Sequence, residues 1–419
     1  MTGESFRFIH ASDFHLERPL GDLDEVPQHL REAMAGAAWK AAATVFETAV
    51  LENVDFVLLS GDLFHPITAG PRGMAMLVEQ FEQLHQQNIQ VFWTTGQVDD
   101  LAKLGDGLAL PPNVTVFPRD RSEQAYVRRA GDTIAVVVGR SNDGRSGLHV
   151  PSFRHDPVEE FTIALGYGTS DATALAEGRF DYWALGGEHQ RRTLDGAAGV
   201  GASYCGSPQG RSLSETGAHG FHLVDIHADG SSRVHFIESD SFRYVNVELG
   251  GADLGTASDL RSLLSQRIAR LQHEHGDRHL LVGWEIHLGA DSPMGAGDPT
   301  ELLSWLRREF GHGSPAAWSV KLDVIAPPQF PQSWLEEDTI LGDFLRAAGT
   351  HRKTGGRDLQ LASLTEEHPG LAPAMEAALV EADPASRAAT LDHATLLGVE
   401  LLRGGKPRLA MVGDGKEYR

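Results

Sequence analysis

Cysteine, long apolar runs and glycine-rich nucleotide-binding loops are scarce or missing in this sequence, and each absence excludes a class of protein. Cys205 is the only cysteine among 419 residues, which rules out an intramolecular disulfide and favours a reducing compartment. No run of about 18 apolar residues occurs, and the first residues lack an export signal, so we expect neither membrane insertion nor secretion. Without a Gly-x-Gly-x-x-Gly motif or a P-loop, ATP hydrolysis is not expected. These absences predict a soluble, cytoplasmic protein.

Basic residues are also in deficit. The chain has 36 Lys and Arg residues against 58 Asp and Glu residues, which gives a net charge of -22. A protein that holds DNA by itself releases counterions through clustered Lys and Arg side chains. We therefore expect the isolated chain to bind DNA weakly. One cluster of basic residues does occur, and it consists of Arg119, Arg121, Arg128 and Arg129. Ordinary surface ion pairs explain this cluster as well as phosphate contact does.

Acidic and imidazole side chains follow the first two segments that the sequence predicts as strands. Asp13 and His15 come at the end of the strand predicted for residues 6–12, and Asp62 follows the apolar run 56–59. Residues at i and i+2 of an extended segment point to one side, so Asp13 and His15 are expected to bind one cation together. Asp62 lies where a buried parallel strand presents its ligands. Taken singly, each Asp is equally well explained as a helix N-cap or a turn residue.

Several segments resemble the motifs of the calcineurin-like metallophosphoesterases, in the family's order. They are FIHASDFHL at 8–16, SGDLF at 60–64, TGQVD at 95–99 and WALGGEH at 183–189, the last standing where the family has Gly-His-x-His. Within the family, the chain looks most like the DNA repair exonucleases of the SbcD/YhaO type, which residues 204–211 and 215–217 also resemble. The resemblance implies an α/β layered sandwich with two central sheets flanked by helices.

The resemblance also implies a ligand set for one metal ion. In the family, the first ion is held by the residues that correspond here to Asp13, His15, Asp62 and His189. All four ligand types are present. A site of two carboxylates and two imidazoles suits Mn²⁺, Fe²⁺ or Zn²⁺. We therefore expect one divalent metal ion.

The family's second metal site is degenerate in this sequence. Gln97 stands at the position of the family's Asn ligand, and Val98 stands at the position of its proton-donor His. The two further His ligands are replaced by Gly166 (or Tyr167, if the register slips by one) and by Gly187. General acid help is worth a factor of roughly a hundred to ten thousand. The resemblance thus leaves it uncertain whether the chain is an enzyme, and we expect weak or no phosphodiesterase activity with no identified catalytic residue.

Several residues near the predicted site have two interpretations. Gln97 keeps an amide oxygen for a second ion, although it is one methylene longer than Asn. Glu188 is either a surface carboxylate or a replacement ligand for that ion. Three arginines are candidate phosphate-binding residues, and surface ion pairs are an equally good explanation for them; they are Arg191, Arg192 and Arg211.

The length predicts more than one domain. Residues 1–240 are expected to form the metallophosphoesterase domain, 241–330 a small α/β capping domain, and 331–419 a C-terminal helical region. In relatives, such a helical region docks on an SbcC-like coiled-coil ATPase, and apolar stripes in residues 335–403 fit that partner or a folded helical tail equally well. Two functions follow: a metal-dependent DNA exonuclease of low activity, or a non-catalytic scaffold or regulatory subunit of an SbcC-like ATPase complex.

Overall fold

The computed structural model describes residues 4–101, 109–154, 158, 160–194, 201–250, 257–287, 299–325, 330–356, 359 and 384–404. The chain divides into two compact units, which we describe separately. The first comprises Met1–Val247, Gln266–Gly283 and Leu303–Lys321, and the second comprises Glu248–Ser265, Trp284–Leu302 and Leu322–Arg419. The domain boundaries that the sequence predicts, after residues 240 and 330, stay a prediction.

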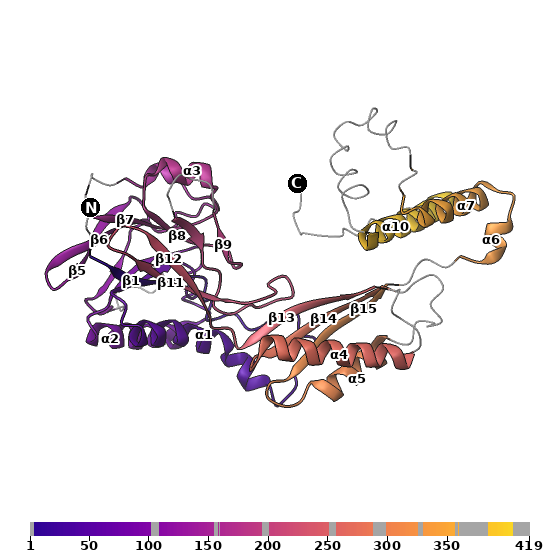
Figure 1. Ribbon diagram of the computed structural model, residues 1–419, viewed down its shortest axis with the longest axis horizontal. Coiled ribbons are helices and arrows are strands. Elements are labelled where there is room, and N and C mark those ends of the chain that lie inside the picture. Colours follow the sequence, from indigo (N-terminus) through magenta and orange to yellow (C-terminus); the bar gives the residue numbers. More distant parts are fainter. Residues whose placement is uncertain are drawn as a thin grey trace. The chain divides into compact units, whose positions relative to one another are not determined.

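A six-stranded mixed sheet carries the first two predicted strands (Figure 1). Its order is β12-β11-β1-β2-β3-β4, with β1 (Phe6–Ala11), β2 (Phe56–Ser60), β3 (Gln90–Thr94), β4 (Val114–Val116), β11 (Gly220–Ile226) and β12 (Ser232–Glu238). The pairs β1·β2, β2·β3 and β3·β4 are parallel, whereas β11 runs antiparallel to β1. The carboxyl ends of β1, β2 and β3 therefore meet at one edge of this sheet.

A second six-stranded sheet has the order β5-β6-β7-β8-β10-β9. Its strands are β5 (Glu123–Arg129), β6 (Asp132–Gly139), β7 (Phe161–Tyr167), β8 (Tyr182–Gly186), β9 (Arg192–Thr193) and β10 (Gly201–Tyr204). The central pairs β6·β7 and β7·β8 are parallel. Tyr167 is paired with Gly186 in the β7·β8 register, so the ends of these two strands lie side by side.

Apolar side chains fill the space between the two sheets. Phe8 and Phe56, from neighbouring strands of the first sheet, stack with ring centroids 4.9 Å apart. They belong to one fully buried cluster with Ile163 and Tyr182 of the second sheet. Complete burial of a side chain of this size is worth roughly 1.5–3 kcal/mol, so this layer holds the two sheets face to face.

Helices cover the outer faces of both sheets. On the first sheet, Phe46 of α1 (Arg31–Leu51) and Phe81 of α2 (Gly70–Gln86) are buried against strand residues such as Leu59. On the second sheet, Leu175 of α3 (Ala172–Glu177) is buried in one cluster with Trp183. The predicted layered sandwich, with two central sheets flanked by helices, is confirmed.

The region predicted as a small α/β capping domain contains strands and helices in alternation among its described residues. They are β13 (Phe242–Leu249), α4 (Ala257–His275), β14 (His279–His287), α5 (Pro299–Phe310) and β15 (Ala317–Ile325), and the three strands form a sheet in the order β13-β14-β15. Within the first unit, Tyr244 and Trp318 at the start of this sheet pack with Leu30 and Met34 in one buried cluster.

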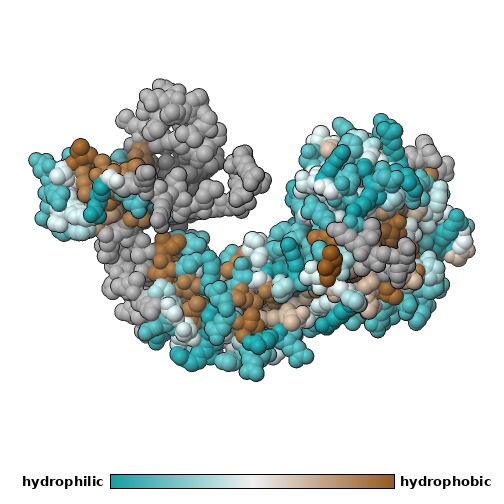
Figure 2. All heavy atoms as spheres, turned by 180° about the vertical axis from the view of Figure 1, so that it is seen from behind, coloured by the Kyte–Doolittle hydropathy of each residue, from teal (hydrophilic) through white to brown (hydrophobic). Residues whose placement is uncertain are grey.

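The C-terminal region contains α6 (Gln332–Glu336), α7 (Ile340–Lys353) and α10 (Pro384–Leu402). The predicted helical character of this region is confirmed for the described residues, whereas 357–358, 360–383 and 405–419 lie outside them. Leu345 is buried, but Ile340, Leu396 and Leu401 are 76%, 44% and 58% exposed, and Figure 2 shows hydrophobic residues gathered on these helices. Within the described ranges, no helix combines the length and apolarity needed to cross a bilayer.

Candidate metal centre

The chain turns sharply after β1 and β2, which differs from the extended backbone that the sequence argument assumes. Asp13, His15 and Asp62 have φ angles of 56°, 43° and 52°, in the left-handed region. Each such residue costs roughly 1–3 kcal/mol, and strain of this kind gathers at functional sites. Hydrogen bonds hold the two turns together: the Asp13 N–H donates to the Gly61 carbonyl at 2.9 Å, and the His15 N–H donates to the Asp62 carbonyl at 3.1 Å. The side chains of Asp13 and His15 therefore come together through these turns. The prediction that they do so as residues i and i+2 of an extended strand is wrong.

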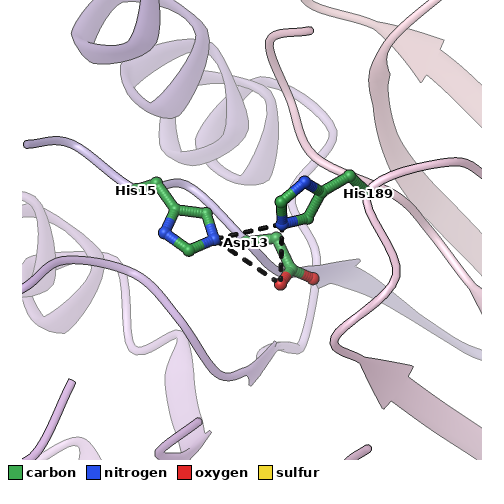
Figure 3. Close-up of side chains that lie close together, drawn as sticks. All are labelled: Asp13, His15 and His189. Atoms are coloured by element: carbon green, nitrogen blue, oxygen red, sulfur yellow. Dashed lines mark hydrogen bonds and ion pairs between the residues drawn. The ribbon is translucent and has the colours of Figure 1, made fainter. Parts of the chain in front are cut away.

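Three side chains bring ligand atoms together at this sheet edge (Figure 3). Asp13 Oδ1 lies 4.0 Å from Nε2 of both His15 and His189, and these two nitrogens are 3.2 Å apart. Asp13 and His15 are buried. Asp13 Oδ2 accepts a hydrogen bond from the Gly187 N–H at 3.0 Å, but Asp13 Oδ1 has no hydrogen-bond partner among the described residues. A buried carboxylate oxygen without a donor is costly, and a cation would satisfy it.

Carboxylates lie behind both imidazoles. His189 Nδ1 donates to Glu215 Oε1 at 2.7 Å, which leaves its Nε2 as an acceptor that faces Asp13. His15 Nδ1 lies 3.4 Å from Glu17 Oε1, close enough for an ion pair but without hydrogen-bond geometry. A carboxylate behind the other ring nitrogen is the usual way in which a metal-binding His is oriented. With both hydrogens on Nδ1, three lone pairs face one point, and this donor set fits a divalent metal ion.

The charges around the centre offset one another. Burial opposes the ionised form of Glu215, but the hydrogen bond from His189 and the charge of Arg211 lower its pKa to about 2. Burial raises the pKa of Asp13, and the two imidazoles oppose that rise. Burial also lowers the pKa of the Arg211 guanidinium, which donates to the Asp13 carbonyl at 3.3 Å.

Asp62 lies beside the three ligand atoms, but both of its oxygens already accept hydrogen bonds. Oδ1 accepts from the Val98 N–H at 2.8 Å, and Oδ2 accepts from the Tyr167 hydroxyl at 2.5 Å. Oδ2 is also 3.8 Å from His15 Nε2. The structure therefore gathers three of the four predicted ligands and places Asp62 at their edge. Ligation by these residues stays a prediction.

The positions that correspond to the family's second metal site contain no cluster of three or more ligands among the described residues. Tyr167, not Gly166, points to Asp62, so the slipped register is the one that the structure has. Gly166 faces the other way, because a Cβ there would meet Leu148 and Phe153. Gln97 is exposed.

Glu188 and the candidate phosphate-binding arginines make other contacts. Glu188 forms an ion pair with Arg192, whose guanidinium lies 5.1 Å from the centre of the Tyr204 ring. Arg191 lies 4.3 Å from the centre of the Phe236 ring. Arg211 is buried against Asp13 and Glu215. Phosphate binding by these arginines stays a prediction, and the buried Arg211 is the least accessible of them.

Two functional residues escape the sequence argument. Glu215 lies 26 residues beyond His189, so only the fold shows that it orients that ring. Asp99, quoted only as part of a motif, accepts from the Gly96 N–H at 2.5 Å and from the Leu63 N–H at 3.2 Å, and thereby ties together the loops after β2 and β3. Its burial, aided by the Asp62 charge, raises its pKa to about 7. The signal for Asp99 in the sequence is an acidic residue that follows a strand closely.

Several known proteins are similar to this chain. The calcineurin-like phosphoesterase family matches residues 6–191. The uncharacterized metallophosphoesterase YhaO of Bacillus subtilis is 25% identical over 333 residues, which cover 75% of this chain and 81% of that protein. The DNA double-strand break repair protein Mre11 of Thermoplasma acidophilum is 25% identical over 304 residues, 67% of this chain and 76% of that protein. The Mre11 protein of Archaeoglobus fulgidus is 33% identical, but only over 97 residues, 23% of this chain and 20% of that protein. The chain therefore carries a calcineurin-like metallophosphoesterase domain and is a homologue of the YhaO and Mre11 proteins.

Proposed function

We propose that this chain binds one divalent metal ion through Asp13, His15 and His189, with Asp62 beside them, and that it is a DNA phosphodiesterase of low activity. The observation that carries the proposal is the buried Asp13 Oδ1, which has no hydrogen-bond partner among the described residues and lies 4.0 Å from each of two imidazole nitrogens. Mn²⁺, Fe²⁺ and Zn²⁺ are the ions that this mixture of carboxylate and imidazole suits.

The chain's own residues support part of a phosphodiesterase mechanism. A divalent ion held there would polarise a phosphoryl oxygen and lower the pKa of a bound water. Glu215 keeps the His189 ring oriented, and the Gly187 N–H fixes the Asp13 carboxylate. Val98 offers only its backbone N–H, which Asp62 accepts, so its side chain has no proton to give the leaving group. Loss of a general acid costs a factor of roughly a hundred to ten thousand, which supports low activity.

Electrostatics support a dependence on a partner for any action on DNA. Three arginines of the basic cluster are engaged by carboxylates: Arg119 by Asp100, Arg121 by Asp120 and Glu123, and Arg129 by Asp55. These ion pairs and the net charge of -22 both disfavour strong binding of phosphates by the chain alone. We infer that an SbcC-like coiled-coil ATPase supplies the DNA-binding surface and contacts residues 335–403. The exposed side chains of Ile340, Leu396 and Leu401 support that contact.

Metal stoichiometry tests the proposal directly. The protein is stripped with a chelator, dialysed against Mn²⁺ or Zn²⁺, and analysed by mass spectrometry of the metal. We expect one ion per chain, and none in the His189→Ala variant. The matched control is His235→Ala, which removes a histidine of the edge strand β12 that pairs with Asp225 of β11 at 3.1 Å. Two ions in the wild type, or one ion retained by His189→Ala, would refute the proposal. A bound ion without hydrolysis of DNA ends would leave the scaffold function predicted from the sequence.

A further inference from the structure

Tyr167 lies at the end of β7 with its hydroxyl on the carboxylate that borders the metal centre. The O–H donates to Asp62 Oδ2 at 2.5 Å, a short distance for a bond between oxygens. Since the Val98 N–H already occupies Asp62 Oδ1, both oxygens of Asp62 have donors. An ion on the Tyr167 side of Asp62 would have to displace the hydroxyl.

The Tyr167 ring fills a space that three glycines leave open. A Cβ on Gly61 would lie 2.5 Å from Tyr167 Cδ2, one on Gly96 would lie 2.7 Å from Cε2, and one on Gly187 would lie 3.1 Å from Cζ. These glycines follow three different strands, β2, β3 and β8. Ring and glycines therefore fit one another, and a side chain at position 187 would crowd the ring, which would have to shift by a few tenths of an ångström.

The surroundings of the hydroxyl are anionic. A phenol is neutral near pH 7, so the Tyr167 hydroxyl has a hydrogen to donate to Asp62 Oδ2. A neutral hydroxyl donor thus satisfies a carboxylate that a second cation would otherwise neutralise.

We propose that Tyr167 stands in for a second metal ion: its hydroxyl satisfies Asp62, its ring fills the space between Gly61, Gly96 and Gly187, and the centre is thereby limited to a single ion. This inference deepens the proposed function, because it names the residue that sets the number of ions. It is a statement about the difference that Tyr167 makes, so its test compares the number of ions in Tyr167→His with that in the wild type, and two ions in the wild type would overturn it.

The test compares metal stoichiometry among variants of the full chain. Tyr167→His shortens the side chain and offers a ring nitrogen beside Asp62, and we expect it to bind one more Mn²⁺ per chain than the wild type. Tyr167→Phe is the matched control, because it keeps the ring in the glycine-lined space and should add no ion. Electron paramagnetic resonance provides a readout that is independent of activity: a spin-coupled Mn²⁺ pair should appear in Tyr167→His, whereas Tyr167→Phe should give the signal of an isolated ion.

Each outcome decides between the two claims. An equal stoichiometry in Tyr167→His and the wild type would overturn the role of Tyr167, even if the wild type binds its single ion. A wild type without any ion would refute the proposed function, while a gain of one ion in Tyr167→His would still support the role of Tyr167. Thermal unfolding shows whether the variants fold. If Tyr167→His does not fold, Tyr167→Asn, which also offers a ligand oxygen in less volume, replaces it with the same expected gain.

Discussion

Replacement of Glu215 by Gln is the most direct probe of how the fold prepares the candidate metal centre. The Glu215 carboxylate accepts the His189 Nδ1 hydrogen at 2.7 Å and thereby directs Nε2 towards Asp13. Glutamine retains an oxygen of similar reach but loses the charge. The His189 ring would then be a poorer electron donor, and its orientation would be less firmly held.

The expected magnitude follows from the type of bond that is lost. A hydrogen bond to a charged group contributes roughly 1.5–3 kcal/mol, and the loss of such a carboxylate partner typically reduces metal affinity by a factor of about 10–100. That factor corresponds to about 1.4–2.8 kcal/mol, so the two estimates agree. We expect Glu215→Gln to bind Zn²⁺ about 10–100 times more weakly than the wild type.

The assay is competition with a chromophoric chelator, which measures the Zn²⁺ affinity of both proteins under one set of conditions. The matched control is Glu17→Gln, since Glu17 lies 3.4 Å from His15 Nδ1 and makes a weaker contact than Glu215 does. Its effect should be several times smaller. The melting temperature of the metal-free variants separates affinity from folding, because Glu215 also accepts the Arg211 N–H at 2.8 Å. An affinity within twofold of the wild type for a folded Glu215→Gln would refute the reasoning.

Three further predictions concern pH, activity and DNA. Burial, aided by the charge of Arg191, lowers the pKa of His222 from 6.5 to about 4. The contribution of His222 to the free energy of unfolding should be complete above pH 6.5 and should fall by about 3 kcal/mol as the pH drops towards 4. In chemical unfolding over that window, His222→Asn should therefore show a flatter pH profile than the wild type. Mn²⁺-dependent degradation of duplex ends should be at least about a hundredfold slower than in relatives with both metal sites; it should remain slow in Val98→His, and an equal rate in the wild type would show that another group supplies the proton. Fluorescence anisotropy at physiological salt should give a duplex dissociation constant weaker than about 1 μM, and nanomolar binding would contradict the argument from net charge.

The layers of the fold were accessible from the sequence because their signals are local. The Ala-rich segment with Val45 and Phe46 predicts a helix that begins and ends close to the bounds of α1, Arg31–Leu51. Continuous apolar runs such as 56–59 predict buried parallel strands, and β2 is buried throughout. Such patterns depend on periodicity and burial within one segment, so distant contacts do not override them.

The centre itself was only partly accessible. Asp13 and His15 could be paired because they are two residues apart, although the left-handed turn that joins them, with φ angles of 56° and 43°, has no signal in an Asp-Phe-His segment. The bond between Tyr167 and Asp62 spans 105 residues. It depends on the packing of one sheet against the other, which no local pattern encodes.

The degenerate positions are better understood as one packed unit than as separate losses. Taken one at a time, Gly187 lacks a ligand that the family has, and Tyr167 is one of two residues that could correspond to the family's other His. Together they are complementary in volume, since the ring lies where a Cβ on Gly187 would come within 3.1 Å of it. A histidine restored at position 187 alone would meet the Tyr167 ring, and one restored at 167 alone would leave a gap beside Gly187. Tyr167→His is expected to admit a second ion, but packing at position 187 and the missing ligands oppose the recovery of activity by that change alone. We expect Gln97→Asn with Val98→His to restore no activity unless His also replaces the residues at positions 167 and 187.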